Sequence, residues 1–433
     1  MPEVKNDESH NNEILGSSSV PVETNCKFEK ILTHPFKIWK CSHPEEIDGL
    51  CIFHMHKPSI DERLNLTPVD LKAVEEIDTR CRKAFVDLFK QIEQNNSIKE
   101  YEFIGFVIPP NSALAITDSP STAMRKLNKP LNFHSARFTG DFGLMLLEIP
   151  NANFRAVEFC GNLIFANIDF DGISLFHDTV FHGIVNFSSV KFLAETYFVN
   201  ANFKKGCEFS DCNFANFTNF DRAFFGKRSS FIGYGGKQVF EGLTLFCELS
   251  FSNNTRLSLI NVSLAKADFY DTDLEFIRFV GVKWNSLKGR PCIWGEVRVL
   301  KIDNDPIARK KNGIHDWDKP PQLEKIAEKY AQLVTNYEQR RDIDNAEAFH
   351  IGEMEIRRIK LASHIDQPWL RKIRENCNSF SIYRILSLYG TSYVQATTAL
   401  ISVVLILSLL FMVTGIEPTI YGKHLCTRQK ISI

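Results

Sequence analysis

The sequence has no excess of charge of either sign. Its 51 Lys and Arg against 52 Asp and Glu leave a formal net charge of −1. We therefore expect no nucleic-acid partner, because proteins that bind nucleic acids carry a basic surface. The 11 Cys show no paired spacing, and no apolar signal segment precedes them. These two absences predict reduced cysteines and a cytosolic N-terminal part. The chain also lacks a nucleophile motif and a pair of carboxylates in a predicted cleft, so we expect no catalytic residues and no enzyme.

Phenylalanine is the residue in excess, with 36 Phe against 10 Tyr and 5 Trp. Fifteen of them recur at alternating spacings of 5 and 6 residues: Phe154, Phe159, Phe165, Phe170, Phe176, Phe181, Phe187, Phe192, Phe198, Phe203, Phe209, Phe214, Phe220, Phe225 and Phe231. Neither a helix nor a strand has this period, so each Phe marks one side of a coil. The residue two positions before each Phe is small, β-branched or aliphatic. Such a pair faces one side of an extended segment, and we expect both members to point inward.

Short segments around these Phe residues resemble the unit A(D/N)(L/F)xx of the pentapeptide-repeat family. The best matches are Ala152-Asn153-Phe154, Ala201-Asn202-Phe203, Cys212-Asn213-Phe214 and Ala267-Asp268-Phe269. The resemblance implies a mainly β fold, a right-handed quadrilateral β-helix over residues 131–284, with a filled interior and a role in protein–protein interaction. Four sides at alternating spacings predict coils of about 22 residues. The spacing returns to five from Leu259 to Phe279. About seven coils at roughly 4.8 Å make a rod about 34 Å long.

One long apolar segment lies near the C-terminus. No charged residue occurs from Ile385 to Ile416, and about 20 residues of helix cross a bilayer. We predict one transmembrane helix over residues 391–416, followed by a short tail over 417–433. Because so few residues follow this helix, we expect it to insert into the membrane after synthesis is complete. We therefore expect a single-pass membrane protein with the bulk of the chain cytosolic.

Between rod and membrane, residues 285–321 read as a linker and residues 322–390 as a helical hairpin with a juxtamembrane segment. The stretches Tyr337–Arg358 and Tyr383–Gly390 resemble segments of bacterial pentapeptide-repeat membrane proteins. That group often continues into a pore loop and a second membrane helix, which this sequence lacks. Two hypotheses follow. The first is a non-enzymatic membrane-anchored scaffold with an unidentified protein partner. The alternative is a truncated or divergent subunit of a two-span ion-channel-like protein with a cytosolic sensor domain, assembled as a homo-oligomer.

The N-terminal residues divide into a polar segment, 1–24, predicted to be disordered, and a small α/β module, 25–130, with a helix over 69–94. The module contains a cluster of metal-ligand types with short paired spacings: Cys41, His43, Cys51 and His54. Thiolate and imidazole are the ligands that zinc prefers, and Cys26 is a fifth candidate. The cluster predicts either a structural zinc site or a turn that happens to contain Cys and His.

Overall fold

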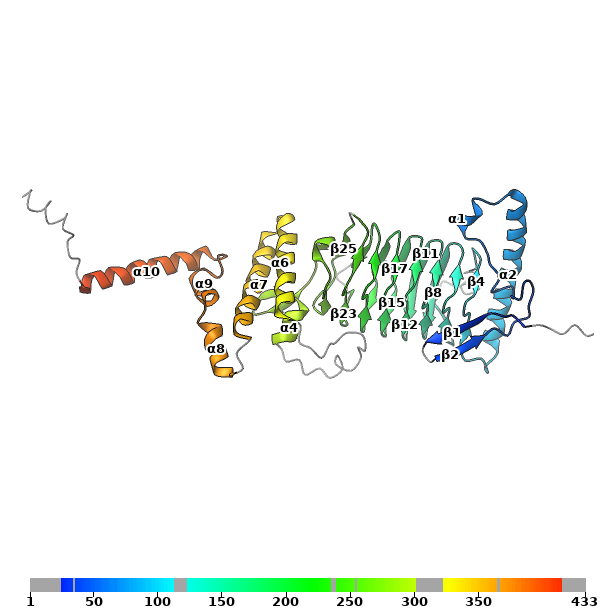
Figure 1. Ribbon diagram of the computed structural model, residues 1–433, viewed down its shortest axis with the longest axis horizontal. Helices are drawn as coiled ribbons and strands as arrows, with labels where there is room; N and C mark the ends of the chain where they lie inside the picture. The colour runs from blue at the N-terminus through cyan, green and yellow to red at the C-terminus, as the bar shows by residue number, and fades with distance from the viewer. Residues whose placement is uncertain are drawn as a thin grey trace, which may run out of the picture.

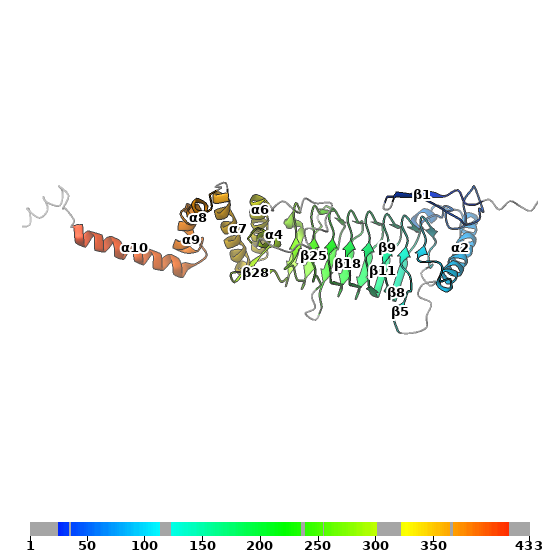
Figure 2. The ribbon, with the colours of Figure 1, turned by 90° about the horizontal axis from the view of Figure 1, so that it is seen from below.

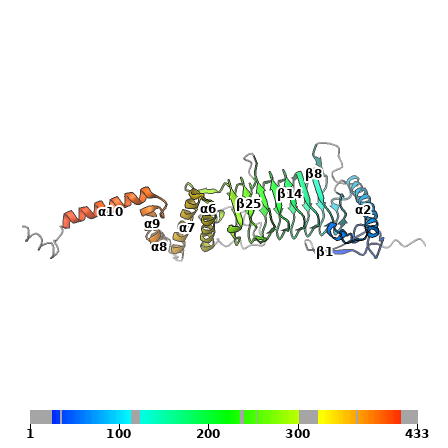
Figure 3. The same ribbon diagram turned by 90° about the horizontal axis from the view of Figure 1, so that it is seen from above.

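The molecule is elongated, with its parts arranged in chain order along one axis (Figure 1). A rod of short strands lies in the middle, an N-terminal module covers one end, and helices α6 to α10 extend from the other. The views turned by 90° show the same order (Figure 2, Figure 3). This computed structural model describes residues 25–33, 36–112, 123–234, 239–253, 255–300, 322–363 and 367–414. The predicted disordered segment 1–24 and the predicted tail 417–433 lie outside the described residues.

The rod is a β-solenoid of about seven turns, as the Phe spacing predicts. One side consists of β3 (Tyr101–Glu102), β6 (Leu131–Asn132), β9 (Ala152–Asn153), β12 (Ser174–Leu175), β16 (Thr196–Tyr197), β20 (Thr218–Asn219), β23 (Thr244–Leu245) and β26 (Ala267–Asp268). The next consists of β4 (Val107–Ile108), β7 (Arg137–Phe138), β10 (Glu158–Phe159), β13 (Val180–Phe181), β17 (Asn202–Phe203), β21 (Phe224–Phe225) and β24 (Ser250–Phe251).

The two remaining sides are joined because β8 and β11 continue around a corner. The third side holds β8 (Phe142–Ile149), β11 (Leu163–Phe170), β14 (Val185–Ser188), β18 (Cys207–Ser210), β22 (Ser230–Ile232), β25 (Leu257–Ile260) and β27 (Ile277–Val280). The fourth holds β5 (Arg125–Lys126), the second halves of β8 and β11, β15 (Lys191–Phe192) and β19 (Asn213–Phe214). Every pairing between successive coils is parallel, and the four sides confirm the predicted quadrilateral β-helix.

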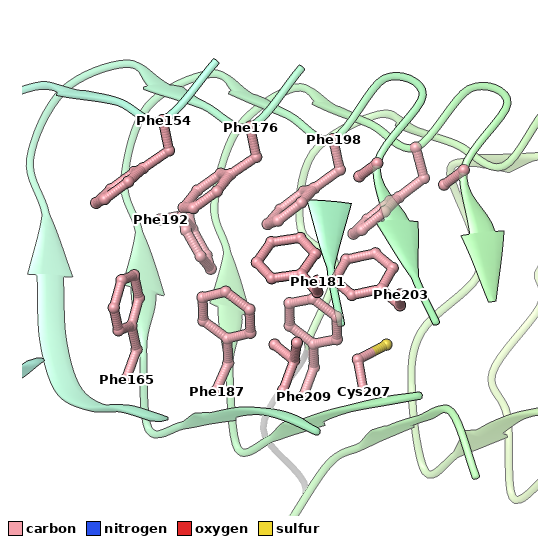
Figure 4. Close-up of a cluster of buried hydrophobic side chains, with 14 of the residues drawn as sticks. Phe154, Phe165, Phe176, Phe181, Phe187, Phe192, Phe198, Phe203, Cys207 and Phe209 are labelled. Carbon is pink, nitrogen blue, oxygen red and sulfur yellow. The ribbon is translucent and has the colours of Figure 1, made fainter. Parts of the chain in front are cut away.

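The predicted register is confirmed in the middle coils, where Phe159 lies opposite Phe181. All fifteen Phe side chains are buried, and so is each residue two positions before them. The rings form columns along the rod (Figure 4). In one column the ring of Phe176 stacks on that of Phe154 at 5.0 Å between centroids, and on that of Phe198 at 4.6 Å. The interior is therefore a continuous aromatic stack.

The corners of the coils explain the alternation of 5 and 6. In the five-residue corners, the residue two positions after Phe adopts a left-handed conformation, as at Asn167 (φ 52°) and Asp178 (φ 55°). Asn and Asp tolerate this conformation better than most residues. The six-residue corners contain Gly172 and Gly183, where a Cβ would lie 1.9 Å and 2.2 Å from a backbone oxygen of the preceding coil. Close stacking of the coils therefore requires glycine at these two corners.

The rod begins earlier in the chain than the predicted boundary at residue 131. Tyr101 of β3 pairs with Leu131 of β6, and β4 pairs with β7, so that residues 101–108 form the start of the rod and do not belong to the N-terminal module. Tyr101 and Leu131 are 30 positions apart in the sequence, against 22 for Phe159 and Phe181 in the middle coils. Additional residues therefore separate the first two coils. A search at the spacing of the middle coils therefore misses the first coil. At the far end Leu259 pairs with Phe279, which confirms the predicted return to a shorter coil.

The N-terminal module contains a hairpin of β1 (Glu29–Thr33) and β2 (Phe36–Lys40), the short α1 (Ile60–Arg63) and the long α2 (Pro68–Gln94). Helix α2 lies across the first coil of the rod (Figure 1). The Phe89 ring stacks on that of Tyr101 at 4.5 Å, and the Phe85 ring lies 4.9 Å from that of Phe103. This end of the aromatic stack is therefore covered.

The other end is covered by the predicted helical hairpin, formed by α6 (Leu323–Gln339) and α7 (Ile343–Ser363). The Asn336 side chain donates hydrogen bonds to the carbonyls of Leu274 and Ile277 at 3.0 and 2.7 Å, at the last coil and its 3₁₀ turn η1 (Leu274–Phe276). The predicted linker 285–321 is structured in its first part, which forms β28 (Asn285–Leu287), β29 (Arg290–Cys292) and α4 (Trp294–Leu300). Residues 301–321 lie outside the described residues.

The chain continues through α8 (Pro368–Asn376) and α9 (Ser379–Ser387) into α10 (Tyr393–Thr414). Residues 393–413 form the one helix, in the described part of the chain, that is long and apolar enough to cross a membrane. None of its apolar segment is buried against the rest of the protein.

Replacing Phe198 with Ala should lower the free energy of unfolding by about 3–5 kcal/mol. Its ring is fully buried between those of Phe176 and Phe220, so the substitution leaves a cavity in the column. Lys205→Ala, at an exposed position of a neighbouring corner, should change it by less than about 0.5 kcal/mol. Denaturant unfolding measures both. Equal effects of the two substitutions would contradict the assignment of the column.

Candidate metal centre

The β1–β2 hairpin brings two cysteines together, one before β1 and the other directly after β2. Its antiparallel register pairs Glu29 with Lys40. Beyond the paired strands, the Cys41 amide donates to the Phe28 carbonyl at 3.1 Å and the Cys26 amide donates to the His43 carbonyl at 2.9 Å. The hairpin therefore holds Cys26 and Cys41 at its open end.

A single helical turn supplies the other two candidates. The amides of His54 and Met55 donate to the Cys51 carbonyl at 3.0 and 3.1 Å. Residues three apart on such a turn lie on one side, so the Cys51 thiol and the His54 imidazole face the same point. The buried Lys57 ammonium donates to the Ile52 carbonyl at 2.6 Å and holds the end of this turn.

Four ligand atoms converge, from Cys26, Cys41, Cys51 and His54, all within 4.8 Å of one another and all on buried residues. The Sγ atoms of Cys41 and Cys51 are 3.8 Å apart. His54 Nδ1 lies 3.2 Å from Cys51 Sγ and 3.7 Å from Cys26 Sγ. With Zn–S near 2.3 Å and Zn–N near 2.0 Å, a zinc tetrahedron has edges of about 3.8 Å between sulfurs and about 3.5 Å between sulfur and nitrogen. The three distances match those edges.

The environment of His54 determines which of its two ring nitrogens can bind a metal. Nε2 lies 3.0 Å from the Ile104 carbonyl, which can only accept a hydrogen bond. Nε2 therefore carries the proton, and Nδ1 presents its lone pair to the three sulfurs. The ring stacks on that of Phe28 at 3.9 Å. A carbonyl on the second nitrogen is the usual arrangement of a histidine that binds a metal.

The same contacts bias one thiol toward its ionised form. The hydrogen bond with Cys41 lowers the pKa of Cys51 against the effect of burial. The hydrogen bond with Cys51 and burial together raise the pKa of the Cys41 thiol. Because metals bind thiolates, the lowered pKa of Cys51 favours binding.

The structure corrects one member of the predicted ligand set. Cys41, Cys51 and His54 belong to the group of four, but the fourth member is Cys26 and not His43. His43 Nδ1 lies 3.4 Å from Cys41 Sγ, and its ring packs edge-on against Phe53 at 4.9 Å. The C-x-H spacing of Cys41 and His43 favoured His43 because spacing takes no account of the hairpin. The register of that hairpin is the signal that places Cys26 in the group.

The centre lies against the first coil of the rod. The Val107 amide of β4 donates to the Phe53 carbonyl at 2.7 Å, inside the turn that carries Cys51 and His54. Gly105 has φ +69°, and a Cβ there would lie 2.2 Å from the Phe28 ring. The metal-ligand cluster, the hairpin and the rod therefore meet at one point of close packing.

Two overlapping stretches of the rod, residues 165–213 and 176–223, match the family described as Pentapeptide repeats (9 copies). The match lies in the middle coils, where the register is regular, and supports the resemblance of the rod. No curated protein and no solved structure matches the chain. The resemblance of the C-terminal segments to membrane proteins with such repeats stays a prediction.

Proposed function

We propose that this chain is a non-catalytic scaffold, anchored to a membrane by α10, whose rod binds a protein partner along its sides. One observation carries the proposal: the interior of the rod is filled by buried Phe columns, so its outer surface is what it offers to other molecules. Both ends are covered, by α2 and by α6. The sides of the rod are therefore the surface available to a partner.

One side carries exposed apolar side chains close together. Ile164 of β11 and Met145 of β8 both point outward, with 49% and 53% of their surface exposed. The strands pair so that Ile164 lies opposite Gly143 and Ala166 lies opposite Met145. The two large side chains are thus diagonal neighbours next to two small residues. We take this pair of exposed apolar side chains as the place where a partner protein would contact the rod.

Photo-cross-linking from position 164 tests the scaffold function in membranes. A benzoylphenylalanine at 164 should cross-link one dominant protein, and one at Lys205, an exposed position in another coil, should not. The double substitution Ile164→Lys with Met145→Lys should reduce recovery of that protein at least about tenfold, since central contacts contribute about 2 kcal/mol or more. Thermal unfolding should be unchanged, because neither side chain is in the core. The proposal fails if no position on the rod cross-links to protein, and cross-links between copies alone would replace it with a homo-oligomer.

The membrane anchor rests on α10. An apolar helix of this length with every face exposed is not a core helix of the folded chain, and a bilayer is the environment that removes its surface from water. We place the rod and the N-terminal module on the cytosolic side, in keeping with the cysteines of the described residues, which form no disulfide.

The double substitution Val404→Arg with Leu407→Arg, in the middle of α10, should release the full chain from membranes. Each Arg near the centre of a span costs about 2.5–3.5 kcal/mol of insertion free energy. Alkaline carbonate extraction measures the release, and Val404→Leu with Leu407→Val should stay in the pellet.

In intact spheroplasts an impermeant maleimide should label Cys426, beyond the span in the sequence, but not the exposed Cys377 before it. Labelling of Cys377 before lysis would reverse the orientation.

We further propose that Cys26, Cys41, Cys51 and His54 hold a structural zinc ion. Three thiolates and one imidazole close a tetrahedron, and no ligand position remains for a substrate. The ion would join the hairpin to the turn at residues 51–54, which bonds to the first coil through Phe53. Its role is thus to fasten the N-terminal module to the rod.

Substituting single ligands tests this site. The full chain prepared without chelator should contain one zinc per molecule by mass spectrometry. Cys26→Ala should lose the ion, whereas His43→Asn should keep it, because His43 lies outside the group of four. Removing zinc should speed hydrogen exchange of the Val107 amide but not of the Phe181 amide, deep in the rod. Absence of zinc from the unsubstituted chain, or equal zinc in the Cys26→Ala variant, would refute the site.

A further inference from the structure

We infer that α8 and α9 form a membrane-surface module that binds anionic phospholipid headgroups beside the span. The inference rests on the proposed anchoring by α10. It adds a second contact with the bilayer, of different chemistry and on different residues. The region lies between the hairpin and α10 in all three views of the molecule (Figure 1, Figure 2, Figure 3).

Helix α8 is amphipathic, with its apolar side unpartnered within the described structure. Trp369, Leu370 and Ile373 are exposed, Trp369 to 63%. At about 100° per residue, these three side chains fall within an arc of about 100°. Lys372 and Arg374, which are also exposed, lie on either side of that arc. Basic residues that flank a Trp-containing apolar stripe are typical of helices lying in the membrane interface.

The C-terminal end of α8 is bonded to the helical hairpin and to α9. The backbone carbonyl of Glu375 accepts hydrogen bonds from Arg358 of α7 at 2.9 Å and from Ser381 of α9 at 2.7 Å. Glu375 projects from α8 about opposite the centre of the apolar arc. The apolar side of α8 therefore faces away from the protein.

Helix α9 also carries exposed apolar side chains. Ile382, Tyr383, Ile385 and Leu386 are exposed, whereas Arg384 turns toward Glu355 of α7, with its Nε 3.3 Å from the carboxylate. Thus α9, like α8, directs apolar side chains outward, and its Arg384 turns to the hairpin. Two consecutive helices with exposed apolar side chains would bury more apolar surface in the membrane interface than α8 alone.

The connection to α10 places this surface at the level of the headgroups. The Gln395 side chain, in the first turn of α10, donates to the carbonyls of Arg384 and Ile385 at 2.9 and 2.6 Å. The end of α9 is therefore fixed to the start of the span and cannot lie far from the membrane surface. Lys372 and Arg374 then meet lipid phosphates, and an anionic leaflet attracts them more strongly than a neutral one.

Fluorescence of Trp369 tests the inference on the full chain reconstituted in vesicles. The vesicles contain phosphatidylcholine brominated on its acyl chains, either alone or mixed with the anionic lipid phosphatidylglycerol. Trp369 is one of five Trp, so Trp369→Phe should remove up to about one fifth of the emission together with most of the quenchable component. Bromines at carbons 6 and 7 should quench more than bromines at carbons 11 and 12, since the ring lies near the headgroups. Phosphatidylglycerol should increase the quenching.

Charge reversal separates lipid recognition from simple proximity. Lys372→Glu with Arg374→Glu should abolish the increase caused by phosphatidylglycerol. The control Lys204→Glu with Lys205→Glu, the same change of charge on the exposed rod, should retain it. Carbonate extraction runs in parallel: release of the chain overturns the anchoring and this inference together. A chain that resists extraction but has an unquenched Trp369 overturns this inference alone, and cross-linking of Cys377 between copies would then assign the face to a second copy.

Discussion

The aromatic stack inside the rod determines what the rest of the chain must do. Each Phe ring is buried only because the coils before and after it place rings against both faces, as Phe176 and Phe220 do for Phe198. A coil at either end lacks one neighbour, so its rings and its open strand edge would face water. Helix α2 supplies rings at one end. Helix α6 supplies Tyr337 at the other, where its ring stacks on that of Phe279 at 6.3 Å.

The two ends solve the strand-edge problem by different means. At the C-terminal end, side chains reach the free carbonyls directly: Asn336 bonds to two of them, and the Lys329 ammonium donates to the Thr272 carbonyl at 2.7 Å. At the N-terminal end, the edge strand β4 bonds to the turn that holds Cys51 and His54. That turn also packs the Phe53 ring on that of Phe106 at 4.5 Å between centroids. A metal ion bound there would hold this turn, and with it the hairpin, against the edge strand.

The sequence allowed the rod to be predicted because its information is local. A Phe at every fifth or sixth position specifies the side, the inward direction and the register, and the structure agrees at Phe159 and Phe181. What could not be predicted depends on contacts between distant segments. Additional residues separate the first coil from the second. Cys26 reaches the metal-ligand group only through the pairing of β1 with β2. Neither feature produces a periodic pattern in the sequence. For the metal-ligand group, spacing alone therefore favoured His43.

Polar contacts, most of them on buried residues, connect the rod to the start of α10 and fix the geometry of this connection. Arg290 forms an ion pair with Glu296 at 2.5 Å, and Glu296 also accepts from the Tyr330 hydroxyl of α6. Farther along, Glu355 of α7 accepts from Tyr389, in the turn before α10, at 2.8 Å. Burial acts to raise the pKa of Glu355, but hydrogen bonds from Arg358 and Tyr389 outweigh it and lower the pKa. The carboxylate stays charged and keeps its donors at neutral pH. Under the proposed anchoring, a rod joined to the start of α10 in this way would extend from the membrane in one direction, with its sides presented to partners at a fixed orientation.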